Sequence, residues 1–126
     1  MLRLSPGNSI YSGVLFFRDM VSNRRFRVSA AYDIYYQELI FAFQGNVFIY
    51  NLNQEDFTYS KSGSIFKSLT DIKVSEVKTK GECILDFSFD LMLYKGVKSR
   101  IYRVKGILKP YKKSTQVSEP IRFEYG

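Results

Sequence analysis

Hydrophobic and polar side chains alternate with a period of two along much of the chain. The clearest case is residues 83–93, where one parity carries only apolar or sulfur-containing side chains: Cys83, Leu85, Phe87, Phe89, Leu91 and Leu93. The opposite parity includes the charged residues Asp86 and Asp90. Successive side chains of a β-strand point to opposite faces of a sheet, so this segment is predicted to be a half-buried strand. Residues 25–33 show the same alternation and predict a second strand. Residues 35–43 predict a third strand, whose two faces are both fairly apolar, as in a central strand of a sheet.

Turn-forming residues separate the alternating segments about every 8 to 15 residues, which is typical of an antiparallel sandwich or barrel. These turn signals lie at residues 22–25, 44–46 and 79–82. The Gly45-Asn46 pair is predicted to adopt the positive φ angles that a tight hairpin needs.

One segment has a helical rather than a strand-like pattern. Ile65, Leu69 and Ile72 follow one another at spacings of four and three, and serines precede them where they can cap a helix. A short helix is therefore predicted near residues 64–71. The fold class expected from the whole pattern is all-β, or β-rich α+β. It is a single antiparallel sandwich or partly open barrel of about seven to nine strands with this one helix.

The composition is that of one folded domain. The chain has 126 residues, of which 45% are hydrophobic and 17% aromatic, and no Pro- or Gly-rich linker divides it. Residues 1–126 are therefore predicted to form a single β-rich domain. No apolar run approaches the ~20 residues of a membrane-spanning helix, so no integral membrane segment is expected. Residues 1–13 lack the apolar run and cleavage site of a secretory signal, which predicts a cytoplasmic protein.

The residue types present exclude several kinds of chemistry. The sequence has no histidine and a single cysteine, Cys83. A disulfide within the chain, a Cys/His zinc cluster and a histidine-activated nucleophile are therefore excluded. Glycine-rich phosphate-binding loops that end in the Walker lysine do not occur either. We predict that the protein is not an enzyme, that it holds no metal and no cofactor, and that Cys83 is a buried structural thiol.

The net charge of +7 favours an anionic partner, and much of it lies in residues 94–113, which carry eight basic side chains and no acid. If this stretch folds back on the preceding strand through a four-residue loop, Asp90 lies opposite Arg103. A two-residue loop would instead place Asp86 opposite Lys105. Either register neutralises the middle of the stretch and leaves its two ends basic.

The uncompensated ends of this stretch, together with the sequence RRFR at a predicted turn, supply the candidate site. The candidate anion- or partner-binding residues are Arg24, Arg25, Arg27, Lys95, Lys98, Arg100, Lys109, Tyr111, Lys112 and Lys113.

Three functions are compatible with this pattern. The first is a non-enzymatic protein-binding or assembly module that uses an exposed strand edge or an aromatic-rich face, with a protein partner or a second copy of the chain. The alternative is a nucleic-acid-binding β-domain that uses the basic clusters 24–27 and 95–113. The third is a barrel that holds an apolar ligand.

Overall fold

The computed structural model describes residues 10–60, 66–95 and 97–111, without the side chains of residues 59, 60, 66 and 95. These ranges form eight β-strands. Their bounds are β1 Ile10–Asp19, β2 Arg25–Asp33, β3 Glu38–Phe43, β4 Asn46–Asn51, β5 Asp56–Ser60, β6 Phe66–Thr79, β7 Glu82–Lys95 and β8 Lys98–Pro110.

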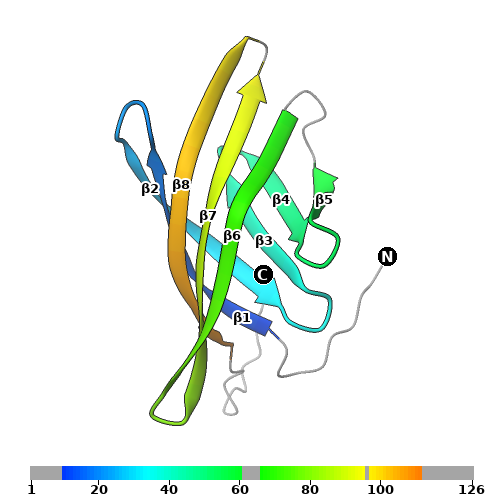
Figure 1. Ribbon diagram of the computed structural model, residues 1–126, viewed down its shortest axis with the longest axis vertical. Helices are drawn as coiled ribbons and strands as arrows, with labels where there is room; N and C mark the ends of the chain where they lie inside the picture. The colour runs from blue at the N-terminus through cyan, green and yellow to red at the C-terminus, as the bar shows by residue number, and fades with distance from the viewer. Residues whose placement is uncertain (1–9, 61–65, 96, 112–126) are drawn as a thin grey trace, which may run out of the picture.

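The strands form one antiparallel sheet in the order β5-β4-β3-β2-β1-β8-β7-β6. This is the strand order of an eight-stranded up-and-down barrel, in which the first strand pairs with the last. Among the described residues, the ladder that would close the barrel, between β5 and β6, is missing. Figure 1 shows the sheet curled around its inner face as a half-barrel that is open between β5 and β6. The predicted all-β class and partly open barrel are confirmed, whereas the structure is not a sandwich of two sheets.

The predicted helix is wrong for the described residues, because β6 begins at Phe66 and continues as strand. A β-bulge between Thr70 and Lys73 explains the helix-like spacing, since it inserts one extra residue into β6. Leu69 and Ile72 therefore both pack against the core, although three positions separate them. The rest of the predicted helix, residues 64 and 65, lies outside the described part of the chain.

The predicted pairing of the basic stretch with residues 83–93 is confirmed in the first of its two registers. Asp90 lies opposite Arg103. The four-residue loop predicted with this register is wrong, because the ladder continues to Lys95 and Lys98 and the connection is two residues long. The register that places Asp86 opposite Lys105 is wrong, because Asp86 pairs with Ile107.

The β3–β4 hairpin turns one residue earlier than predicted. Phe43 pairs with Asn46, which leaves Gln44 and Gly45 as a two-residue turn. Both turn residues have positive φ angles, 53° for Gln44 and 80° for Gly45. Asn46 itself belongs to β4.

The inner face of the half-barrel is a closely packed aromatic core. The predicted inward parity of β2, β7 and β8 is confirmed, because residues such as Val28, Phe87 and Val104 are buried. Rings from distant strands contact one another: Phe17 lies 4.5 Å from Phe43, Phe41 lies 5.1 Å from Phe48, and Tyr32 lies 5.2 Å from Phe87, measured between ring centroids. Edge-to-face and offset contacts of this kind stabilise a core beyond the apolar area that they bury.

Two glycines allow β1 and β8 to approach each other closely. Gly13 of β1 lies opposite Leu108 of β8, and Gly106 of β8 lies opposite Leu15 of β1. A Cβ atom at either glycine would collide with a backbone carbonyl oxygen of the other strand. Each leucine side chain instead lies over the glycine opposite, so two reciprocal Gly–Leu pairs fill the centre of the sheet.

We predict that Gly106→Ala destabilises the protein by about 1 to 3 kcal/mol, the usual cost of forcing extra atoms into a packed interior. The new Cβ would lie 2.9 Å from the Cα of Leu15, so the backbone of one strand has to move. Urea unfolding measures the change, and Lys105→Ala at the adjacent, exposed position is the control, with an expected effect within about 0.5 kcal/mol. Equal effects of the two substitutions would contradict the role of the close approach.

Candidate functional site

Three arginines lie side by side on the outer face of the sheet. Arg18 of β1 lies opposite Arg25 of β2 on one side and opposite Arg103 of β8 on the other. Because neighbouring strands are ~4.8 Å apart, this arginine row is about 10 Å wide at the backbone. Alternation along each strand turns these side chains away from the core, since their chain neighbours Phe17 and Tyr102 are buried.

A second row of the same three strands places an aromatic ring between two cations. Phe16 of β1 lies opposite Arg27 of β2 and opposite Lys105 of β8. Phe16 is 49% exposed, and the Arg27 guanidinium lies over its ring at 5.8 Å from the centroid. We call the arginine row and this Phe16 row together the outer basic patch. It borders a hollow of about 430 Å³ that is lined by Phe16, Phe17, Arg18, Arg25, Arg103 and Lys105.

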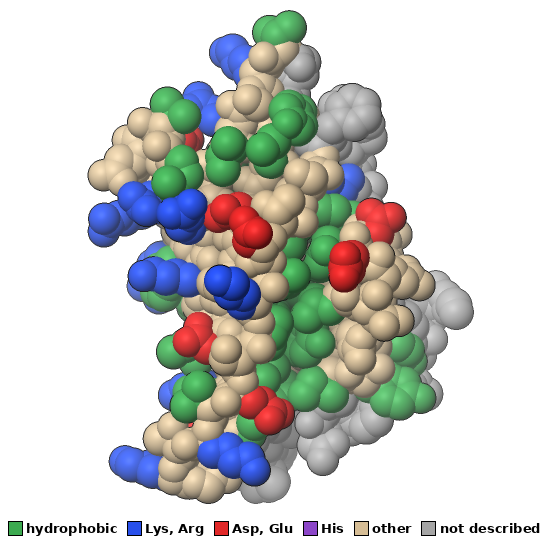
Figure 2. All heavy atoms as spheres, viewed as in Figure 1, with side chains coloured by type: hydrophobic (Ala, Val, Ile, Leu, Met, Phe, Trp, Pro, Cys, Tyr) green, Lys and Arg blue, Asp and Glu red, His purple; other side chains and the backbone are tan. Residues whose placement is uncertain are grey.

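The charge of the outer basic patch is only partly neutralised. Arg103 donates to Asp90 at 3.3 Å, as the sequence predicted. Within the described ranges, no carboxylate makes an ion pair with the other four cations, Arg18, Arg25, Arg27 and Lys105. Figure 2 shows Lys and Arg side chains gathered over β8 at the left flank of the molecule, with carboxylates beside them. Like charges directly opposite each other destabilise a sheet, so the arginine row opposes folding unless an anion screens it.

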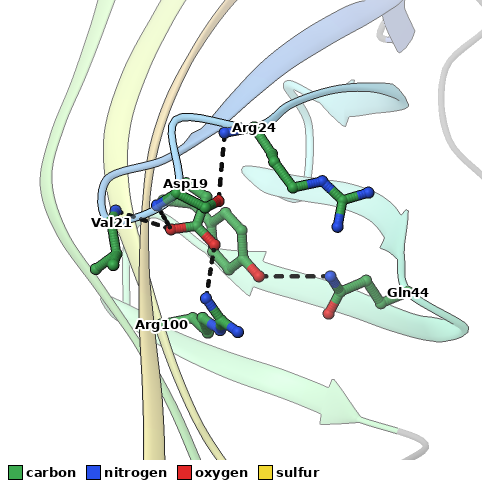
Figure 3. Close-up of polar contacts among 7 residues, drawn as sticks. Asp19, Val21, Arg24, Gln44 and Arg100 are labelled. Carbon is green, nitrogen blue, oxygen red and sulfur yellow. Dashed lines mark hydrogen bonds and ion pairs between the residues drawn. The ribbon is translucent and has the colours of Figure 1, made fainter.

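Two other predicted residues, Arg24 and Arg100, lie away from this patch. They line a second, smaller pocket of about 180 Å³ together with Asp19, Ser22, Phe26, Gln44 and Tyr102. Figure 3 shows that the Arg24 side chain extends toward Gln44, while Arg100 meets Asp19. Arg24 and Arg25 are therefore neighbours in the chain but belong to different sites.

Asp19 organises the turn between β1 and β2. Its carboxylate accepts hydrogen bonds from the backbone N–H groups of Val21 at 2.9 Å and Ser22 at 3.1 Å, and an ion pair joins it to Arg100 at 3.3 Å. Asp33 plays the same part in the turn between β2 and β3, where its carboxylate accepts hydrogen bonds from the backbone N–H groups of Tyr35 and Tyr36. The hydrogen bonds from Ser22 and Val21, with a smaller contribution from Arg100, lower the pKa of Asp19.

The remaining predicted residues do not join either site. Lys98 is exposed at the start of β8, and Lys109 and Tyr111 are exposed at its far end, ~37 Å away along the strand. Lys95 pairs with Lys98 through its backbone, and its side chain is not described. Lys112 and Lys113 lie outside the described residues.

The sequence reasoning missed Phe16 and Arg18 and treated Arg103 and Lys105 as structural. The available signal was the segment VLFFRD, in which Phe16 and Arg18 share a parity opposite to the apolar Leu15 and Phe17. That parity alone could not place β1 beside β8.

Cys83 lies on the inner face of β7 and is partly buried. Burial raises the pKa of Tyr11, and the hydrogen bond between its hydroxyl and Cys83 raises it further. Among the residues that the structure describes, no three acidic or cysteine side chains are grouped to hold a metal ion. The same part of the chain contains no helix with the length and apolarity to span a membrane.

No protein-family model matches this chain, and comparison with curated proteins and with solved structures found no similar protein. The fold and the site define an all-β protein built on an opened up-and-down barrel with a basic outer patch. Its function therefore has to be inferred from the residues themselves.

We predict that Asp19 stabilises the protein above about pH 4 and that this contribution is lost in acid. A carboxylate whose pKa is lower in the folded chain than its ordinary value of about 3.9 binds its proton more weakly there, so folding becomes less favourable as the pH falls through that range. Asp19→Asn removes this titration. The difference in unfolding free energy between wild type and Asp19→Asn, measured in urea, should therefore shrink from about pH 6 to about pH 2.5. A difference that does not vary with pH would contradict the assignment.

Proposed function

We propose that this protein binds single-stranded nucleic acid through the outer basic patch. The observation that carries the proposal is the arginine row beside an exposed phenylalanine, on strands that hold both in fixed register. The basic cluster 24–27 contributes Arg25 and Arg27 to this surface, and the stretch 95–113 contributes Arg103 and Lys105.

Phosphate groups match the cations of the patch. A guanidinium is planar and always charged, and it presents several N–H donors in a fork that suits phosphate oxygens. Four of the five cations are arginines, and four have no carboxylate partner in the described structure. Because these residues belong to paired strands in a fixed register, their charges are spaced regularly along the surface. A polymer with regularly spaced negative charge is the partner that suits such a surface.

The exposed ring favours a single strand over a duplex. Proteins that bind single strands place aromatic side chains on a basic surface, because an unpaired base can stack on the ring while cations follow the backbone. Phe16 has cations on both sides, and the hollow beside it, of about 430 Å³, offers room for a base. A duplex keeps its bases paired and stacked on one another, so it offers no free base face to this ring.

We predict that the protein binds a single-stranded oligonucleotide with an affinity that falls steeply with salt. Each neutralised phosphate contributes a slope of about −0.7 in log K against log salt for single strands, so Arg25→Gln with Arg27→Gln should flatten the slope by about 1.4. Fluorescence anisotropy at several salt concentrations measures it. The control is Lys78→Gln with Lys80→Gln, which removes the same charge at exposed positions of the β6–β7 hairpin.

Phe16→Ala should weaken binding at every salt concentration without a comparable change of slope, because stacking contributes about 1 to 3 kcal/mol per base and releases no counterion. Equal losses in the control and the patch variants would refute the proposed surface. So would binding to vesicles of anionic lipid with none to oligonucleotides.

A second candidate function, assembly between copies of this chain, is favoured by the free edge of β6. This strand has 14 residues and pairs with β7 alone among the described strands. The bulge and the lysines of β6 disfavour pairing with other chains near residue 71. The second half of β6, residues 73–79, is regular strand without a bulge. A second copy aligned antiparallel about Val77, which is 41% exposed, would place each Glu76 opposite the Lys78 of the other copy.

A charge exchange tests this assembly. If the β6 edges pair in that register, Glu76→Lys should weaken self-association, and Glu76→Lys combined with Lys78→Glu should restore it because the opposite charges face each other again. Sedimentation velocity over a range of protein concentrations measures both. A wild-type protein that stays monomeric throughout would exclude the assembly. A double variant no better than the single one would exclude this register.

A further inference from the structure

We infer that the pocket between the β1–β2 and β3–β4 turns is a separate binding site for a small monoanionic carboxylate. It lies on the other side of the sheet from the outer basic patch and has a volume of about 180 Å³, roughly that of six water molecules. The inference does not depend on nucleic-acid binding.

Hydrogen-bond donors from three places in the fold converge on this pocket. Arg24 reaches it from the β1–β2 turn, Gln44 from the β3–β4 turn, and Arg100 and Tyr102 from β8. The Gln44 side-chain amide donates to the Tyr102 hydroxyl at 3.4 Å, which leaves the hydroxyl proton to be donated elsewhere. No described acceptor takes that proton, so a bound oxygen atom is its natural partner.

The charges of the lining select a monoanion. Asp19 is 4% exposed and pairs with Arg100, so these two charges offset each other. Arg24 has no carboxylate partner among the described residues, and one uncompensated positive charge remains in the lining. A carboxylate matches this single charge and the guanidinium fork, whereas a doubly charged phosphate ester would also be repelled by Asp19.

The wall of the pocket favours a ligand with a small apolar body. The Phe26 ring lines the pocket, and the Arg24 guanidinium lies over that ring, 5.5 Å from its centroid. This stacking holds the otherwise flexible Arg24 side chain in place and leaves its N–H groups available at the ring edge. A carboxylate attached to a short apolar or aromatic group can therefore meet the cation and the ring together.

Titration of the folded protein with benzoate tests the site, with binding followed by NMR chemical-shift changes of the Ser22 and Arg24 backbone amides and the Gln44 side-chain amide. Benzamide, which has the same ring without the charge, and inorganic phosphate are the comparison ligands. Arg24→Gln should weaken benzoate binding about tenfold or more, because a hydrogen bond to a charged group is lost. Arg25→Gln is the matched control: it removes the same charge from the adjacent residue, whose side chain lies on the outer face.

The outcomes separate this site from the proposed nucleic-acid surface. We expect Arg24→Gln to weaken benzoate binding and leave oligonucleotide binding unchanged. Arg25→Gln should weaken oligonucleotide binding and leave benzoate binding unchanged. Equal weakening of benzoate by both substitutions, or binding of benzamide or phosphate as tight as that of benzoate, would overturn the inference. Titration with N-acetylphenylalanine and with its amide distinguishes two sources of the carboxylate, a peptide C-terminus and a free small molecule. Binding of the acid alone extends the site to a peptide C-terminus, and binding of neither restricts it to free small carboxylates.

Discussion

The close pairing of the first strand with the last is the interaction on which the rest of the structure depends. β1–β5 and β6–β8 are two runs of neighbouring strands, and among the described strands only the β1–β8 ladder joins them into one sheet. The ladder passes through the pairs of Gly13 with Leu108 and Gly106 with Leu15, in which a side chain on the glycine would strike the opposite backbone. β1 and β8 are far apart in sequence, so bringing them together costs the chain much conformational entropy. The aromatic core that forms when they pair has to offset this cost.

Both proposed sites are consequences of that ladder. Arg18 and Phe16 of β1 meet Arg103 and Lys105 only because β8 lies beside them. The same register brings Arg100 to Asp19 at the end of β1, where the second pocket forms. The outer patch and the pocket therefore lie on opposite faces of β1, β2 and β8, and the alternation of side chains keeps them apart. Gln44 of the β3–β4 turn completes the pocket. A change in the register of β1 and β8 by one residue would exchange the two faces and abolish both sites.

Charge is distributed differently on the two faces. The outer basic patch spreads five cations over three strands, and Asp90 is their one carboxylate partner among the described residues. The patch therefore presents an extended positive field suited to a polymer. The pocket is lined by one uncompensated guanidinium, that of Arg24, and by the buried Asp19, which suits a single small anion. The total charge of +7 is equally compatible with either arrangement. What distinguishes them is whether the cations have acids, rings or other cations as their neighbours.

The sequence by itself determined the elements whose pattern is local. The alternation of residues 83–93, the fold-back of the basic stretch and the pairing of Arg103 with Asp90 depend only on period two and a short hairpin, so they were predicted correctly. The bulge in β6 imitated a helical spacing, because an inserted residue shifts the parity of Leu69 and Ile72 in the way that a helix turn would. Only the tertiary structure decided which strands lie beside β1. Periodicity assigns a side chain to a face but says nothing of its neighbour across the ladder, so the row of three arginines and the separation of Arg24 from Arg25 could not be read from the chain.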